Sequence, residues 1–132
     1  MRRLLMSAYS IVVLGMLAAG AYPSQAVFAL SYNIVDGDSC MALPASAKAR
    51  WDQESGRCTM AGTLILSTHE LLTIGPGVTL VVDGRLTNQG VINNAFGATL
   101  LDKGKITNEG TITNMETSLC QAQGHLATKG FI

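Results

Sequence analysis

The 132-residue sequence has few aromatic residues and no excess of charge of either sign. Phe, Trp and Tyr make up 5% of the residues, Asp, Glu, Lys and Arg make up 14%, and the formal net charge at pH 7 is zero. A nucleic-acid-binding domain normally carries a basic excess, so we expect no nucleic-acid partner. The length allows one small domain.

Long apolar runs are also missing, except near the N-terminus. There an arginine pair precedes a largely apolar stretch, residues 4–21, and Ser24-Gln25-Ala26 fits the small-x-small rule for signal-peptide cleavage. We therefore predict a signal peptide over residues 1–26 and a secreted or cell-surface protein without a membrane span after cleavage. An uncleaved N-terminal anchor is the alternative.

What the sequence does contain is an internal repeat of 20 residues. Residues 77–94 align with residues 97–114, and nine of the 18 aligned positions are identical. A repeat of this length is typical of a solenoid, in which each repeat forms one rung. Apolar and polar residues alternate within it, which indicates extended strands with one side facing inward. We therefore predict an all-β fold, a short single-stranded β-solenoid (β-helix) with about four 20-residue rungs over residues 57–132.

Three columns of inward positions keep a core-compatible residue from rung to rung. These predicted core columns are Met60/Leu80/Leu100/Cys120, Leu66/Leu86/Ile106/Leu126 and Leu72/Ile92/Ile112/Ile132. Even-numbered positions face inward in this reading, and because the period of 20 is itself even, they do so in every rung; we call this the inward parity.

Asparagines occupy two further columns at inward parity, Asn88/Asn108 and Asn94/Asn114. A lone buried amide would be costly, so we expect these side chains to hydrogen-bond from rung to rung as Asn ladders. We expect Gly90 and Gly110 to supply positive φ at the adjoining corner. Asp102 also has inward parity, and we expect it at a corner, turned toward solvent.

Export makes disulfides plausible for the three cysteines. Cys40 and Cys58 bracket a non-repetitive segment, and we pair them; two unpaired thiols are the alternative. We thus expect residues 27–56 to form an irregular N-terminal segment closed by a disulfide. Cys120 falls in a core column and is expected to be a small buried hydrophobic residue.

Residues 84–94 and 104–114 follow the pattern G-x-[LI]-x-N-x-G-x-I-x-N. This pattern resembles the repeats of filamentous-haemagglutinin-like secreted proteins, and the resemblance implies a right-handed β-helix. The stretch from Cys40 to Cys58, with Trp51 between them, also resembles a segment that precedes such repeats in exported microbial proteins. Adhesins of that family are much longer and carry a secretion domain, so the resemblance does not extend to their export route or adhesive role.

The sequence offers little for catalysis. No outward column places two acidic residues together, as the hydrolysis of a glycosidic bond requires. His69 and His125 fall in different columns, and neither has a His or Cys at metal-ligand spacing. We therefore predict no enzymatic activity, no cofactor and no metal site.

The outward positions best suited to a contact are a mildly basic pair, Arg85 and Lys105, and the threonines Thr87 and Thr107. Threonine also simply suits an exposed strand. We predict a non-enzymatic, exported structural or adhesion-type interaction module with a carbohydrate or cell-surface partner. A carbohydrate-active β-helix enzyme and a fragment of a larger surface protein are the alternatives. We also expect self-association through the C-terminal rung, because its strand edges would be unpaired.

Overall fold

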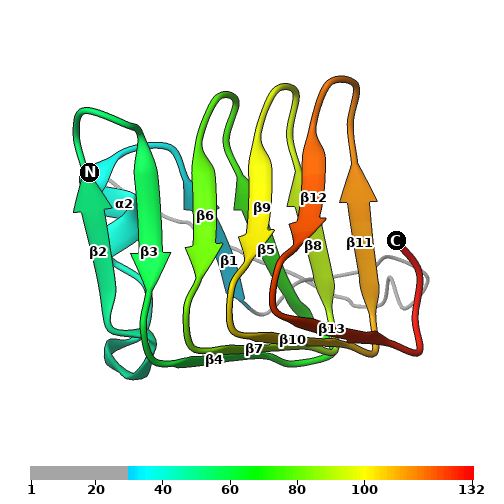
Figure 1. Ribbon diagram of the computed structural model, residues 1–132. Helices are drawn as coiled ribbons and strands as arrows, with labels where there is room; N and C mark the ends of the chain where they lie inside the picture. The colour runs from blue at the N-terminus through cyan, green and yellow to red at the C-terminus, as the bar shows by residue number, and fades with distance from the viewer. Residues whose placement is uncertain (1–29) are drawn as a thin grey trace, which may run out of the picture.

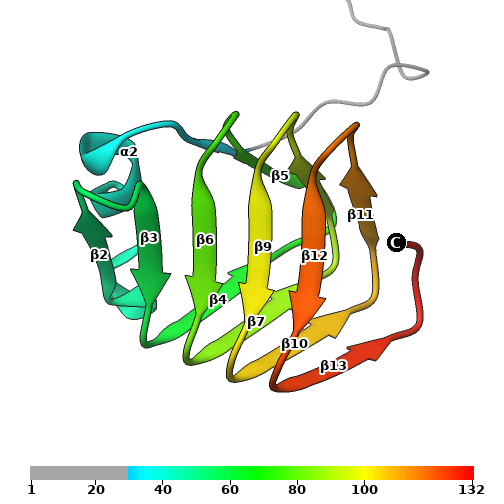
Figure 2. The ribbon, with the colours of Figure 1, turned by 45° about the horizontal axis from the view of Figure 1, so that its top comes forward.

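The computed structural model describes residues 30–132, so the predicted signal peptide lies outside the described residues. Within this range the chain winds into a three-sided coil of about four turns, a β-solenoid (Figure 1). Each side of the coil is one sheet, and each turn adds one strand to each sheet (Figure 2). The predicted all-β solenoid is confirmed.

We name the three sheets after their strands in the second rung. The β6 sheet contains β2 (Ala49–Asp52), β3 (Arg57–Met60), β6 (Thr79–Val82), β9 (Thr99–Asp102) and β12 (Leu119–Ala122). The β7 sheet contains β4 (Thr63–Leu66), β7 (Arg85–Asn88), β10 (Lys105–Asn108) and β13 (His125–Thr128). The β8 sheet contains β1 (Leu30–Ile34), β5 (Glu70–Ile74), β8 (Val91–Asn94) and β11 (Thr111–Asn114).

The register of the later rungs follows the 20-residue repeat. Leu80 pairs with Leu100 and Leu100 with Cys120 in parallel, and equivalent pairs follow in the other two sheets. Residues of the predicted core columns that are at most 1% exposed are Met60, Leu66, Leu72, Leu80, Leu86, Ile92, Leu100, Ile106 and Ile112. Full burial of such a side chain contributes roughly 1.5–3 kcal/mol to folding, so these columns account for much of the stability.

The last described rung is less buried than the predicted core columns imply. Leu126 pairs with Ile106 in the expected register, but it is only partly buried against the core, and so is Cys120. Ile132, the third residue expected in this rung, is 52% exposed. The reason is that β12 and β13 are edge strands, so a neighbouring rung covers their inward side chains from one side only. Leu126 thus lies in its predicted core column and packs against the core, although it is only partly buried.

The first rung is two residues longer than the repeat, which corrects two predicted columns. Cys58, and not Met60, lies opposite Leu80, while Met60 lies opposite Val82. In the next sheet Leu64 lies opposite Leu86, and Leu66 lies opposite Asn88.

The two extra residues are at the corner that follows β4. Residues 67–70 fill this corner in the first rung, where residues 89–90 suffice in the second, and the 20-residue register resumes where Leu72 pairs with Ile92. Since the insertion is an even number of residues, the inward parity is unchanged.

The N-terminal segment is not irregular, contrary to the sequence-based expectation. It contains β1, the helix α2 (Gly37–Met41), the short 3₁₀ helix η2 (Ala45–Ala47) and β2. β1 extends the β8 sheet by pairing in parallel with β5, and β2 pairs antiparallel with β3. Together with α2, these strands lie at the N-terminal end of the coil (Figure 1).

Two local features fix this segment. Asp36 and Ser39 form a capping box at the start of α2, in which the backbone N–H of Ser39 donates to Asp36 Oδ1 at 2.9 Å. A disulfide joins Cys40 to Cys58, as expected from the sequence, with Cα atoms 5.7 Å apart. Because Cys58 continues the Leu80 column, this disulfide ties α2 directly to the core.

None of the helices described between residues 30 and 132 has the length and apolar character that crossing a membrane requires.

Candidate functional site

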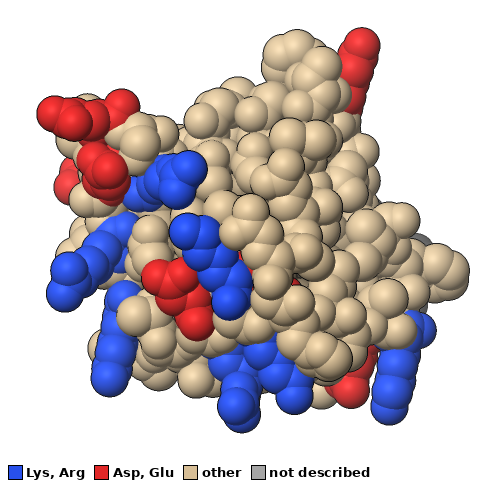
Figure 3. Space-filling view, viewed as in Figure 1, with Lys and Arg blue, Asp and Glu red and all other residues tan. Residues whose placement is uncertain are grey.

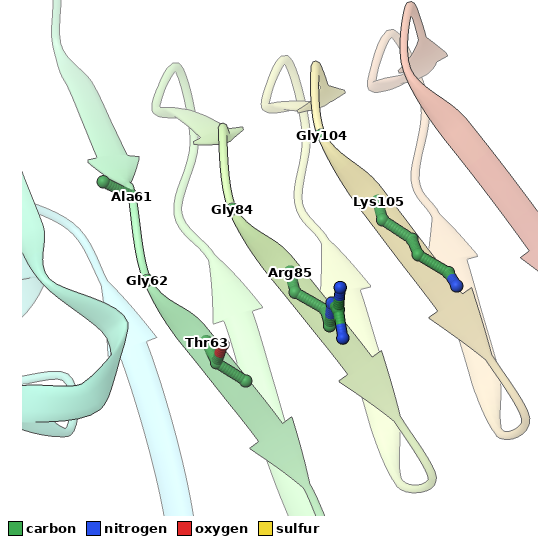
Figure 4. A pocket seen from close by; sticks show the side chains of 7 residues that line it. All are labelled: Ala61, Gly62, Thr63, Gly84, Arg85, Gly104 and Lys105. Atoms are coloured by element: carbon green, nitrogen blue, oxygen red, sulfur yellow. The ribbon is translucent and has the colours of Figure 1, made fainter.

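A groove of about 310 Å³ follows the corner between the β6 and β7 sheets (Figure 4). Three consecutive rungs contribute to it. Its lining residues are Ala61, Gly62, Thr63, Gly84, Arg85, Gly104 and Lys105.

Glycine forms the floor of the groove because the rungs approach one another closely there. A Cβ atom on Gly84 would overlap the carbonyl oxygen of Gly62, and one on Gly104 would overlap the carbonyl oxygen of Gly84. Backbone hydrogen bonds cross this corner, such as the one from the N–H of Lys105 to the carbonyl of Gly84 at 3.0 Å. The floor is therefore bare main chain for reasons of packing.

One rim of the groove is basic. Arg85 of β7 lies opposite Lys105 of β10 in parallel register, both side chains are exposed, and both extend in the same direction from their strands (Figure 4). Thr63 and His125 occupy the same column in the rungs on either side. Lys and Arg side chains gather along the lower edge of Figure 3, the side on which β4, β7 and β10 lie in Figure 1.

The second outward column of the β7 sheet is uncharged. It contains Ile65, Thr87, Thr107 and Ala127 in register. The structure thus brings all four predicted contact residues together on one sheet, and none of the outward residues on its described strands is acidic. The nearest acid along the chain is Asp83, which directly precedes Gly84 in the sequence and is not among the residues that line the groove.

Asparagine ladders support the strands beneath this face. Asn88 Nδ2 donates to Asn108 Oδ1 at 2.8 Å and to the carbonyl of Thr111 at 3.0 Å, and both side chains are fully buried. Asn94 Nδ2 donates to Asn114 Oδ1 at 3.0 Å in the β8 sheet. These hydrogen bonds replace those that the Asn88 and Asn108 side chains lose on burial, whereas the buried Oδ1 of Asn94 has no hydrogen-bond partner.

Gly90 and Gly110 do not take positive φ, contrary to expectation. The glycines with positive φ in residues 30–132 are Gly56, Gly77 and Gly97. Gly90 is needed because a Cβ atom would overlap the carbonyl oxygen of Glu70, and the N–H of Gly90 donates to Asn88 Oδ1 at 3.0 Å. The repeat correctly indicated that these two positions require glycine, but the reason is the lack of space for a Cβ atom and not a positive φ.

Asp102 is buried in the core, and the expectation that it turns toward solvent is wrong. Its side chain is 1% exposed, between Val82 and Ala122 in the same column, and neither carboxylate oxygen has a hydrogen-bond partner. The chain turns one residue later than expected, at Lys103 and Gly104, where both N–H groups donate to the carbonyl of Val82.

Burial raises the pKa of Asp102, and the nearby N–H of Gly104 and the charge of His125 act in the opposite direction. Cys120 lies next to this carboxyl group and is only half-buried, not fully buried as expected. Burial, with a smaller contribution from Asp102, raises the pKa of the Cys120 thiol. A raised thiol pKa lowers the fraction of reactive thiolate at neutral pH.

The histidines are separated, as the sequence suggested, since His69 lies at the corner before β5 and His125 lies on β13. Among residues 30–132, no group of three or more His, Cys, Asp and Glu side chains is arranged to hold a metal ion.

Comparison of the chain with protein-family models, curated proteins and solved structures finds no match in any of the three. The likeness to filamentous-haemagglutinin-like proteins therefore depends only on the repeat residues and the stretch from Cys40 to Cys58.

Proposed function

We propose that this protein is an exported, non-enzymatic interaction module with a structural or adhesion-type role, which meets a carbohydrate or cell-surface partner through the β7 sheet. The observation that carries the proposal is the groove with its basic rim, where Arg85 and Lys105 stand side by side above a floor of bare main chain. Such a surface can bind charged groups and hydroxyl groups. Its lining contains no carboxylate, thiol or imidazole to act as an acid, base or nucleophile.

Two further observations support an extracellular role. The Cys40–Cys58 disulfide is of a kind that persists in oxidising compartments, and the sequence before the described residues fits a signal peptide. The repeat pattern also supports kinship with filamentous-haemagglutinin-like proteins at the level of the coil.

Self-association is part of the same proposal. In the last described rung Leu119 is 51% exposed, Phe131 77% and Ile132 52%. β12 and β13 are edge strands of their sheets, and exposed edges with apolar side chains favour pairing with another chain. At the N-terminal end β2 pairs with β3, α2 packs against β1 and β2, and η2 packs against β4, so we expect a closed pair that joins two C-terminal rungs.

The test begins with the full chain expressed in an exporting host and purified from the exported fraction. We expect the protein outside the cytoplasm, bound to a glycan array or to cell surfaces without releasing sugar products, and dimeric in sedimentation at high concentration. Release of soluble sugars that ceases when one acidic residue is changed would overturn the non-enzymatic role. A monomer at every concentration would overturn the self-association.

A further inference from the structure

We propose that the groove binds an acidic linear polysaccharide, with the polymer running along the coil axis and its carboxylate or sulfate groups against Arg85 and Lys105. This inference builds on the proposed function, because it names the chemical class of the partner for the same surface. It depends on three features of the groove: the spacing of its charges, its open floor and its lack of aromatic residues.

The charges are spaced by the coil itself. Arg85 and Lys105 are direct neighbours in adjacent parallel strands, and adjacent strands lie about 4.8 Å apart. Both side chains carry a positive charge, so an anion placed between or along them is favoured. One rung is comparable to the length of one sugar ring in an extended chain, which allows successive sugars to present their acidic groups to successive rungs.

The floor allows a broad ligand to approach closely. Gly62, Gly84 and Gly104 carry no side chains at the bottom of the groove (Figure 4), and the packing of the rungs forbids any larger residue there. The groove by itself is thus a consequence of the fold. The basic rim is what distinguishes it from the corner at Gly90 and Gly110, which is flanked by Gln89 and Glu109, hydrogen-bonded to each other at 3.1 Å.

The groove suits a polysaccharide better than other polyanions. None of its lining residues is aromatic, so it has nothing on which a nucleic-acid base could stack. The adjoining Thr87 and Thr107 hydroxyls, on the outward side of the same strands, can exchange hydrogen bonds with sugar hydroxyls.

The experiment compares polymers and matched variants of the full exported chain. The probes are polygalacturonate and dextran sulfate, with amylose and dextran as neutral polymers, and duplex DNA and polyglutamate as the other polyanions. Affinity is measured by isothermal titration calorimetry at several salt concentrations. The groove variant is R85Q/K105Q, and the matched control R50Q/K129Q removes the same charge from exposed residues outside the groove lining.

We expect binding to an acidic polysaccharide that weakens with salt and not to the neutral polymers. We expect R85Q/K105Q to lose roughly tenfold or more in affinity, since charge-assisted contacts are of this order, while R50Q/K129Q changes little. Asp83 directly precedes the groove residue Gly84, so D83N removes a nearby negative charge and is expected to strengthen binding.

Three results would overturn the inference. These are an equal loss in both double variants, tighter binding to DNA or polyglutamate than to either acidic polysaccharide, and no binding to the acidic polymers. If R85Q/K105Q still binds neutral glycans or cells as the unchanged protein does, the acidic-ligand inference fails while the proposed function survives. If no glycan or cell surface is bound by the folded protein, the proposed function fails as well.

Discussion

Asp102 stacks directly on Val82 inside the coil, so that a carboxyl group continues an apolar column. The Asp102 side chain replaces a methyl-bearing one at the same place in the cross-section, and neither of its oxygens has a hydrogen-bond partner. A buried polar group without a partner costs about 1–3 kcal/mol. Asp102, with two unpartnered oxygens, is therefore a weak point of the described core, and the Oδ1 atom of Asn94 is the other buried side-chain atom there without a partner.

Replacing Asp102 with valine should stabilise the protein. D102V repeats the side chain of the rung below, and it removes the unpartnered carboxyl group, so we expect a gain of about 1–3 kcal/mol in the free energy of unfolding at pH 7. Denaturant titration followed by circular dichroism measures it. The reciprocal variant V82D is the control and should destabilise the protein. A D102V protein less stable than the unchanged one at pH 7 would show that Asp102 has a partner in solution.

The same carboxyl group should make stability depend on pH. The pKa of Asp102 is raised in the folded protein above its ordinary value of 3.8, so the folded state holds this proton more tightly than the unfolded state. Its contribution to stability is then fully present below pH 3.8 and is lost as the pH rises through the raised pKa. The charge of His125 attenuates the shift, and Cys120 is the other titratable neighbour.

The measurement compares the unchanged protein with D102N over pH 3–8. Asp36 and Asp52 have lowered pKa values, because each accepts hydrogen bonds from its own turn, and they act in the opposite direction. The difference between the two proteins isolates Asp102, since both retain the other carboxyl groups. We expect the advantage of D102N to grow as the pH rises from about 3.8. A difference that is constant with pH would contradict the raised pKa.

The asparagine ladders should contribute unequally to stability. Asn108 is fully buried, accepts from Asn88 and donates to Thr128 Oγ1 and the carbonyl of Phe131. Asn114 also accepts from its ladder partner but is exposed. We expect N108L to cost about 1–3 kcal/mol, because it leaves the Asn88 amide without this acceptor, and N114L to cost much less, because water replaces the lost group. Equal costs in thermal or chemical unfolding would mean that burial does not govern the ladders.

The sequence was sufficient to predict the length of the repeat and the alternation of inward and outward residues. They predicted the coil, the inward-facing residues and the pairing of Arg85 with Lys105, because a repeat fixes which residues lie one rung apart. They also placed Leu126 in the right column, but parity does not say how well a rung is covered, and its partial burial was missed. The register of the first rung was missed as well, since its corner contains two extra residues and the repeat is too faint there to reveal them.

Asp102 was misplaced for a different reason. The alternation of the repeat placed Asp102 inside the coil. We expected it to face solvent instead, because charged side chains generally avoid the core. The groove could not be foreseen either, since its floor depends on how closely the rungs approach at Gly84, a distance that no spacing in the sequence specifies.

Alanine substitutions at two corner glycines test how closely adjacent rungs approach each other at Gly84. Gly84 has no room for a Cβ atom, which would overlap the carbonyl oxygens of Gly62 and Ala61, whereas a Cβ atom on Gly77 would contact nothing within 4 Å. Gly77 instead has a φ of 76°, so alanine there incurs only the left-handed backbone penalty of about 1–2 kcal/mol. We expect G84A to be the more destabilising, because relieving the overlap requires adjacent rungs to separate and lose their hydrogen bonds. Unfolding of both variants in urea ranks them, and a G84A protein as stable as G77A would show that the rungs are more loosely stacked than the structure describes.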